Sequence, residues 1–247
     1  MSKSYQQFLK EKSGKTAVYT FGRFNPPTIG HEKLLRVVQT TSSNEGGDYF
    51  IYTSHSQDSK KNPLTHKQTI HFLKLIFPKY RPYIEDSLAK TALDAASEIH
   101  DKGGYTKLMM VVGSDRVRDF SSLLNRYNDK KSKHGYYNFD SIEVISAGER
   151  DPDAEGADGM SASKMRQAVV DGDYDSFKMG VPAGTSDSIC KNLYGAVAKG
   201  LQLKLKEDLG LDDLDELLNP AQLRKLSLRM KVQAKKPGFI KKRQIAM

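Results

Sequence analysis

The stretch that decides the fold is Phe21-Gly22-Arg23-Phe24-Asn25-Pro26-Pro27-Thr28-Ile29-Gly30-His31. An apolar, β-prone run at residues 16–20 precedes it, and apolar residues at helical spacing follow it from Leu34 to Val38. The stretch therefore predicts a strand, a glycine- and proline-rich turn and then a helix. Such a turn leaves backbone N–H groups unpaired at the start of a helix, where they can bind phosphate.

The composition indicates a globular protein with one main core. Hydrophobic residues make up 38% of the 247 residues and charged residues 28%, values typical of globular domains. The apolar runs are too short to span a bilayer, so no membrane partner is expected. The first 12 residues are polar and lack the apolar segment of a secretory signal. The single cysteine, Cys190, excludes an intrachain disulfide and fits a cytoplasmic location.

The net charge of +9 resides in the C-terminal tail. Residues 221–247 carry nine Lys or Arg and no acid, which leaves 30 basic and 30 acidic residues in the first 220. Upstream of this tail, the segment 204–220 alternates leucine with acids. We predict a main domain at 1–203 and a charged helical extension at 204–247. The basic tail would dock on a polyanion or a large assembly, independently of the chemistry of the main domain.

Strands and helices alternate along the main domain. Strands are expected at about residues 16–21, 49–52, 83–84, 108–112 and 142–145, and the all-apolar run 108–112 is typical of a strand buried on both faces. The main helices are expected at about 30–41, 65–78 and 91–100, with a short one at 2–12. This order predicts a Rossmann-like α/β fold, in which helices flank a parallel sheet. In such a sheet the turns after strands one, four and five share the edge where ligands bind.

The opening stretch resembles the phosphate-binding signature of the nucleotidylyltransferase superfamily. That signature is His or Thr, any residue, Gly and His, and here it is Thr28-Ile29-Gly30-His31. A second signature of the superfamily is a Ser/Thr-rich turn that opens a helix and ends in Lys or Arg. Residues 161–166, SASKMR, match it. Residues 62–65 and 112–116 are similar to segments of adenylyltransferases that act on pyridine mononucleotides. The resemblance covers roughly residues 15–180 and is strongest to nicotinamide and nicotinate mononucleotide adenylyltransferases.

The resemblance implies that His31, Arg166 and Thr28 are catalytic. His31 would donate a hydrogen bond to the α-phosphate of an NTP, and the polyphosphate would favour its charged form. Arg166 would hold the β- and γ-phosphates with its fork of donors, and Thr28 would supply a further donor. Gly30 would let a flat base approach the backbone. The other nucleotide-binding positions implied by the resemblance are Gly22, Arg23, Phe24, Asn25, Gly113, Asp115, Arg116, Ser161, Ser163 and Lys164.

The expected substrates are ATP or another NTP and a phosphorylated small-molecule acceptor such as nicotinamide mononucleotide, which would place the enzyme in NAD biosynthesis. Mg²⁺ is expected to arrive on the nucleotide phosphates, because no dedicated metal cluster is visible in the sequence. Two alternatives stay open. One is a cytidylyltransferase that makes a CDP-activated metabolite, and the other is a non-catalytic interaction protein that docks through its basic tail. The sequence also leaves the oligomeric state open.

Three other groups of residues have a structural as well as a functional interpretation. His55 and His66 flank a polar loop, and solvent-exposed histidines are the preferred interpretation. Lys60 and Lys61 either reach a substrate phosphate or belong to a solvated face. The acid-rich segment 149–158 lacks the spacing of an EF-hand loop and predicts a mobile, solvated lid.

Overall fold

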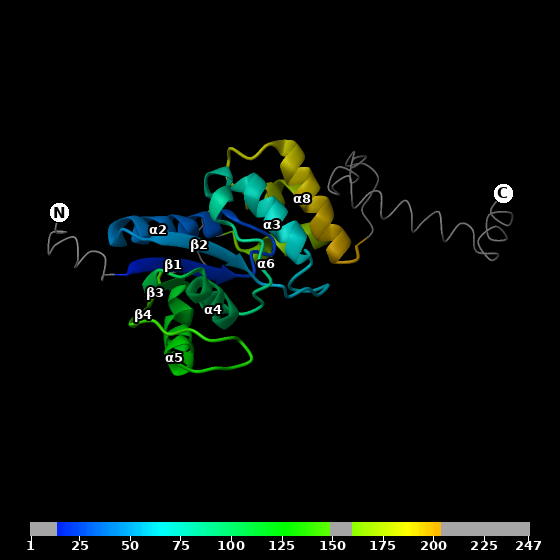
Figure 1. Ribbon diagram of the computed structural model, residues 1–247. Coiled ribbons are helices and arrows are strands. Elements are labelled where there is room, and N and C mark those ends of the chain that lie inside the picture. Colours follow the sequence, from blue (N-terminus) through cyan, green and yellow to red (C-terminus); the bar gives the residue numbers. More distant parts are fainter. Residues whose placement is uncertain (1–13, 149–159, 204–247) are drawn as a thin grey trace, which may run out of the picture. The chain divides into compact units, whose positions relative to one another are not determined.

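The computed structural model describes residues 14–148 and 160–203. In these ranges four strands form one sheet, in which every neighbouring pair is parallel. The strand order is β2-β1-β3-β4, so the chain leaves β1 toward one edge and later returns to build the other half (Figure 1). The predicted parallel α/β fold is confirmed. The strands are β1 (Lys15–Gly22), β2 (Asp48–Thr53), β3 (Tyr105–Val112) and β4 (Ser141–Ser146).

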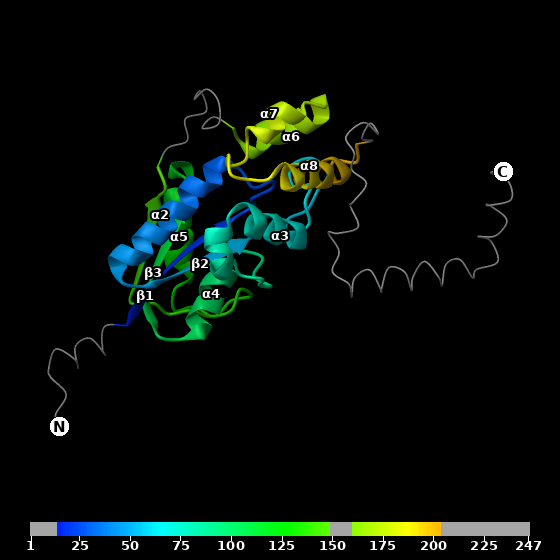
Figure 2. The ribbon, with the colours of Figure 1, turned by 90° about the horizontal axis from the view of Figure 1, so that it is seen from above.

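Helices cover both faces of the sheet (Figures 1 and 2). On one face α2 (Ile29–Glu45) packs against β1, β2 and β3, and on the other α4 (Ala92–Lys102) packs against β1 and β3. α5 (Val117–Tyr127) packs against β4, and α3 (His66–Ile76) against β2 and α8. The last three helices of the described residues contact one another. Of these three, the sequence predicted only the start of the first. They are α6 (Ala162–Asp171), α7 (Tyr174–Lys178) and α8 (Asp187–Gly200).

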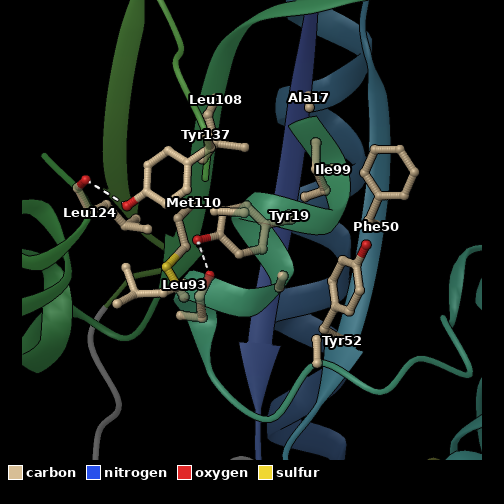
Figure 3. Packing of buried hydrophobic residues seen from close by; sticks show 14 of the residues in the cluster. Ala17, Tyr19, Phe50, Tyr52, Leu93, Ile99, Leu108, Met110, Leu124 and Tyr137 are labelled. Carbon is tan, nitrogen blue, oxygen red and sulfur yellow. Dashed lines mark hydrogen bonds between the residues drawn. The ribbon is translucent and has the colours of Figure 1, made fainter. Parts of the chain in front are cut away.

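Alternate strand residues form the core between the sheet and α4 (Figure 3). This period of two is the natural consequence of a pleated strand, whose successive side chains point to opposite faces. The buried phenols keep hydrogen-bond partners: Tyr19 donates to the carbonyl of Ala92 at 3.2 Å, and Tyr137 donates to the carbonyl of Leu124 at 2.8 Å. The strand residues on this face include Ala17, Tyr19, Phe50, Tyr52, Leu108 and Met110.

The strand predicted at Tyr83-Ile84 is wrong. The segment Pro78–Tyr83 forms a 3₁₀ helix, η1, and Ile84 makes a single parallel bridge to Ile51 at the edge of β2. Proline has no N–H to donate to a sheet and is confined to turns, helix starts and strand edges. With Pro78 and Pro82 so close, the chain contributes one bridging residue to the sheet instead of a strand.

The helix predicted at 30–41 is longer in the structure, where α2 ends at Glu45 and Gly46 adopts a left-handed conformation with φ of 61°. No helix in the ranges 14–148 and 160–203 is long and apolar enough to cross a membrane. Three predictions fall outside the described residues: the helix at 2–12, the lid at 149–158 and the helical extension at 204–247.

Candidate active site

A cavity of about 500 Å³ opens at the carboxyl ends of β1 and β3. β1 lies between β2 and β3, and the chain leaves these strands in opposite directions, which is the switch point where open α/β sheets bind ligands. Four segments far apart in the sequence line the cavity. The lining residues are Thr20, Phe21, Gly22, Arg23, Phe24, Asn25, His31, Leu34, Ser54, Lys61, Val112, Gly113, Asp115, Arg116, Phe120, Ser161, Ala162, Ser163 and Arg166.

The turn after β1 contains Phe24, whose backbone adopts an unusual conformation. Its φ is 45°, in the left-handed region that residues other than glycine rarely adopt, and its side chain is 1% exposed. A Cβ on Gly22 would come within 2.8 Å of the Phe24 ring, so the ring can occupy this place because residue 22 is glycine. The buried ring then lies against the imidazole of His31, with 4.8 Å between the ring centroids.

His31 lies in the first turn of α2, and its ring is fixed by the residue that caps the helix. The backbone N–H of Thr28 donates to Nδ1 of His31 at 2.9 Å, and the Thr28 hydroxyl lies 3.1 Å from the same nitrogen. An Nδ1 that accepts a backbone N–H carries no proton, so the ring proton belongs on Nε2. Protonation of Nδ1 would break this bond, because both ring nitrogens of an imidazolium are donors. The charged form that a bound polyphosphate would favour stays a prediction.

Arg166 enters the cavity from α6 and is held by two hydrogen bonds. Its Nη1 donates to the backbone carbonyl of Asn25 at 2.7 Å, and its Nη2 donates to Oγ of Ser163 at 2.9 Å. Burial lowers the pKa of Arg166, and the nearby charge of Arg23 lowers it further. Two guanidinium groups brought together in this way favour a strongly anionic ligand.

Ser161 and Ser163 occupy the predicted turn at the start of α6. Ser161 is the N-cap, and its Oγ accepts the backbone N–H of Lys164 at 3.1 Å. This bond satisfies one of the N–H groups that a helix start leaves unpaired. The hydroxyl of Ser163 is engaged with Arg166. Ser161 thus caps the helix, and Ser163 orients Arg166.

The turn after β3 contributes Gly113, Asp115 and Arg116 to the cavity wall. Asp115 and Arg116 belong to the short helix η2 (Ser114–Arg116), and Oδ2 of Asp115 lies 3.4 Å from Nε of Arg116. Both side chains are more than half exposed. A Cβ on Gly113 would approach Oδ1 of Asp115 to 2.8 Å, so the glycine leaves room for this carboxylate beside the strand end.

Three predicted site residues do not line the cavity. Thr28 is 2% exposed and lies behind His31, where it contacts the ring nitrogen instead of the open space. Gly30 and Lys164 are exposed on α2 and α6 and are absent from the described cavity wall. Lys61, for which two interpretations were open, lines the cavity, whereas Lys60 does not.

Several cavity residues were not predicted from the sequence, among them Leu34, Ser54 and Phe120. Leu34 follows His31 by three positions, so helical spacing places both on one side of α2 and could have identified it. Ser54 follows β2 directly, at the same sheet edge as the turn after β1. Phe120 lies on α5, and its spacing relative to Arg116 gives a weaker signal of the same kind.

A second cavity of about 460 Å³ contains His55 and His66. Their rings stack at 3.6 Å with an angle of 20° between the planes. Nε2 of His55 donates to the carbonyl of Ser87, and Nδ1 of His66 lies 2.9 Å from Oγ1 of Thr53. The preferred interpretation of the two residues as solvent-exposed loop histidines is therefore wrong. Burial lowers the pKa of His66, and the neighbouring His55 lowers it further.

The segment that follows β2, residues 54–66, contributes residues to both cavities. Ser54 and Lys61 line the first cavity, and His55 and His66 line the second. Leu88, which is 88% exposed, provides an apolar rim to the second cavity. The first cavity is thus lined by cationic side chains and the second by aromatic and apolar ones, and one short segment contributes to both.

Among solved structures, the fold is similar to one described as "Putative Nicotinate-nucleotide Adenylyltransferase" from Vibrio parahaemolyticus. The two chains share 14% sequence identity, and the match covers 72% of this chain and 98% of the other with a TM-score of 0.39. No curated protein matches the sequence. The model of the cytidylyltransferase-like family matches residues 19–168, a range that begins in β1 and ends in α6. The chain therefore belongs to the cytidylyltransferase-like family of nucleotidyltransferases.

Proposed function

We propose that this protein transfers AMP from ATP to a phosphorylated small-molecule acceptor such as nicotinamide mononucleotide. A phosphate oxygen of the acceptor attacks the α-phosphorus, the bond between the α-phosphorus and the bridging oxygen breaks, and pyrophosphate leaves with the electron pair. Negative charge grows on the oxygens around the α-phosphorus and on the leaving group. The protein needs to position both reactants and to stabilise this charge.

One observation carries the proposal: His31 and Arg166, 135 positions apart in the sequence, converge on one cavity at the switch point of the sheet. His31 presents an Nε2 donor at the N-terminal end of α2, where the helix dipole also favours an anion. Arg166 presents a guanidinium that the Asn25 carbonyl orients. A donor for the α-phosphate and a clamp for the leaving pyrophosphate are the two groups that this chemistry requires.

The charge of the cavity supports a polyphosphate ligand. Four cationic side chains line it, Arg23, Lys61, Arg116 and Arg166, whereas Asp115 is the one carboxylate on the part of its wall that the structure describes. A single carboxylate fits a Mg²⁺ ion that is held mainly by phosphates and water. Such an ion would neutralise charge on the triphosphate, while Arg23, Arg116 and Arg166 bind the remaining oxygens.

The second cavity supports a planar acceptor. The stacked imidazoles of His55 and His66 and the exposed Leu88 suit a flat ring, because aromatic faces gain stability by stacking. Lys61, on the segment shared by both cavities, would bind the acceptor phosphate near the α-phosphorus. A pyridine mononucleotide has both parts, a flat ring and a phosphate.

Release of pyrophosphate tests the proposal. Purified protein with Mg²⁺ is incubated with each of ATP, CTP, GTP and UTP, and with nicotinamide mononucleotide, nicotinate mononucleotide or glycerol 3-phosphate. We expect acceptor-dependent release with ATP and a pyridine mononucleotide, and release that is slower by about 10²–10³-fold from an Arg166→Ala protein. Release with CTP and glycerol 3-phosphate alone would establish the cytidylyl alternative. No release with any pair would exclude transfer to these acceptors.

A second candidate function rests on the charge segregation of the sequence. All of the formal excess charge lies in residues 221–247, which suits docking on a polyanion. A chain that ends at Asn219 should keep nucleotidyl transfer and lose retention on immobilised heparin. Retention of the full chain should fall steeply as salt rises, because cation–phosphate contacts release counterions. Unchanged retention after truncation would remove this candidate.

A further inference from the structure

Asn25 joins two segments that are distant in the sequence. Its Nδ2 donates to the carbonyl of Leu64 at 2.9 Å, and its Oδ1 accepts the N–H of Leu64 at 2.9 Å. Its own backbone carbonyl accepts Nη1 of Arg166 at 2.7 Å. Asn25 is 4% exposed, so these bonds form where solvent cannot replace them.

The side chain of Asn25 fixes the segment that the two cavities share. Leu64 is fully buried, and Thr65, the next residue, is the N-cap of α3, where its Oγ1 accepts the N–H of Gln68. His66 follows at the wall of the second cavity, and Lys61 precedes at the wall of the first. The paired bonds to Leu64 therefore set the positions of residues on both sides.

The backbone of Asn25 fixes Arg166. The guanidinium has one bond to Ser163 within its own helix and one bond to Asn25. The second bond is the one that ties α6 to the turn after β1. One residue thus sets the place of the arginine through its carbonyl and the place of the shared segment through its amide.

We propose that Asn25 is a positioning residue, which holds the segment of Lys61 and His66 in register with Arg166. The inference rests on the proposed function, since two reactants must meet with the acceptor oxygen in line with the leaving group. A displacement of about 1 Å can lower the rate by about 10²-fold in such a reaction. In this role the amide of Asn25 acts through its two bonds to the backbone of Leu64.

Asn128 provides a matched control. Its Nδ2 donates to the carbonyl of Phe139 at 2.9 Å and its Oδ1 accepts the N–H of Phe139 at 3.0 Å, the same pair of bonds that Asn25 makes with Leu64. Asn128 is not on the wall of either cavity. Asn128→Ala therefore removes equivalent bonds without displacing the shared segment, and separates positioning from a general loss of stability.

The kinetic test compares Asn25→Ala with Asn128→Ala in the full chain. Alanine keeps the carbonyl that binds Arg166, so we expect the KM for ATP to change little. We expect kcat to fall about 10²-fold through misplacement of the acceptor and the KM for the acceptor to rise. Asn128→Ala should keep both constants at the wild-type values. Should Asn25→Ala not fold, Asn25→Asp is used, which keeps the acceptor for the Leu64 N–H and loses the donor to its carbonyl. Equal kinetic constants for the Asn25 and Asn128 variants would overturn the inference.

Amide hydrogen exchange with Mg²⁺ and ATP tests the same inference without turnover. In the wild type, ATP should slow exchange in residues 61–69 and in residues 161–168. In Asn25→Ala, exchange of 64–69 should be faster before ATP is added, and ATP should protect 161–168 alone. Exchange of 61–69 that matches the Asn128→Ala protein, with and without ATP, contradicts positioning by Asn25. A wild type that transfers no nucleotide would refute the proposed function, while the exchange pattern would still decide the role of Asn25.

Discussion

The backbone N–H of Thr28 donates to Nδ1 of His31 across 2.9 Å. This bond determines which nitrogen of the imidazole carries the proton, and leaves Nε2 as the donor. It also joins the helix cap to the catalytic candidate, because Thr28 is the N-cap of α2 and His31 is its third residue. The threonine at this position therefore orients the histidine from behind instead of contacting the cavity.

Replacement of His31 should remove one preorganised donor to the α-phosphate. We expect His31→Ala to lower kcat by about 10²–10³, the effect of losing a single donor of this kind, with little change in ATP affinity. The measurement is steady-state release of pyrophosphate. His71→Ala, on the exposed surface of α3, serves as the control and should keep wild-type turnover. Near-wild-type turnover in His31→Ala would refute the assignment.

The neutral ring of His31 also predicts a pH dependence. Protonation of Nδ1 would place two donors, the ring N–H and the Thr28 N–H, against each other. Turnover should therefore decrease as the pH falls and His31 becomes protonated, and should not require an imidazolium. A kcat that rises on the acid side, with ATP and acceptor saturating, would show that the charged form is the active one.

Replacement of Arg166 should weaken nucleotide binding and slow turnover together. The side chain bridges Asn25 and Ser163, and its loss removes the fork that would hold the leaving pyrophosphate. We expect Arg166→Ala to lower kcat/KM for ATP by about 10²–10³. Arg166→Lys should restore only part of this loss, because lysine keeps the positive charge but lacks the fork of donors. Lys164→Ala, on the same helix but off the described cavity wall, is the control. Unchanged ATP binding and turnover in Arg166→Ala would make the residue structural.

Alanine substitutions at two glycines of the turn, Gly22 and Gly30, should have different effects on the stability of the fold and on ATP binding. A Cβ at residue 22 would meet the Phe24 ring at 2.8 Å, so Gly22→Ala should destabilise the fold by about 1–3 kcal/mol through overpacking. At residue 30 the nearest atom is Oγ1 of Thr28 at 3.5 Å, an ordinary contact. Gly30→Ala should therefore keep the melting temperature and weaken ATP binding, if a base lies against this backbone.

Gly184→Ala is the control for both glycine variants, because a Cβ there meets nothing within 4 Å. Thermal denaturation and ATP titration of the three proteins give the answer. Unchanged ATP affinity in Gly30→Ala would remove Gly30 from the binding site.

The stacked histidines predict a stability change with pH. The pKa of His66 is lowered, first by burial and then by the charge of His55. Between the lowered pKa and the ordinary one, the unfolded chain binds more protons than the folded one, so stability falls as the pH decreases through this window. We expect the melting temperature of the wild type to fall between about pH 7 and pH 5, and that of His66→Gln to fall less. A His55→Gln protein should lie between the two. An equal pH dependence in wild type and His66→Gln would contradict this contribution.

The sequence by itself predicted the fold through strong local patterns. The apolar run 108–112 became β3, the turn 21–31 became the end of β1 and the start of α2, and Ser161 became the cap of α6. These features depend on burial periodicity and on side chains that bond to their own backbone, so neighbours along the chain are enough to specify them. The pair His31 and Arg166 was likewise predicted from motifs, and the sheet edge placed both at one cavity.

The tertiary structure alone decided how these residues are used. The bond from Arg166 to the Asn25 carbonyl joins residues 141 positions apart, and the stack of His55 on His66 depends on how the loop between these two residues folds. The neutral tautomer of His31 depends on an N–H whose direction follows from the turn that Phe24 closes. Local sequence fixes which groups are present, but contacts across the sheet edge fix which atoms meet, because hydrogen bonds and ring contacts require ångström-scale geometry.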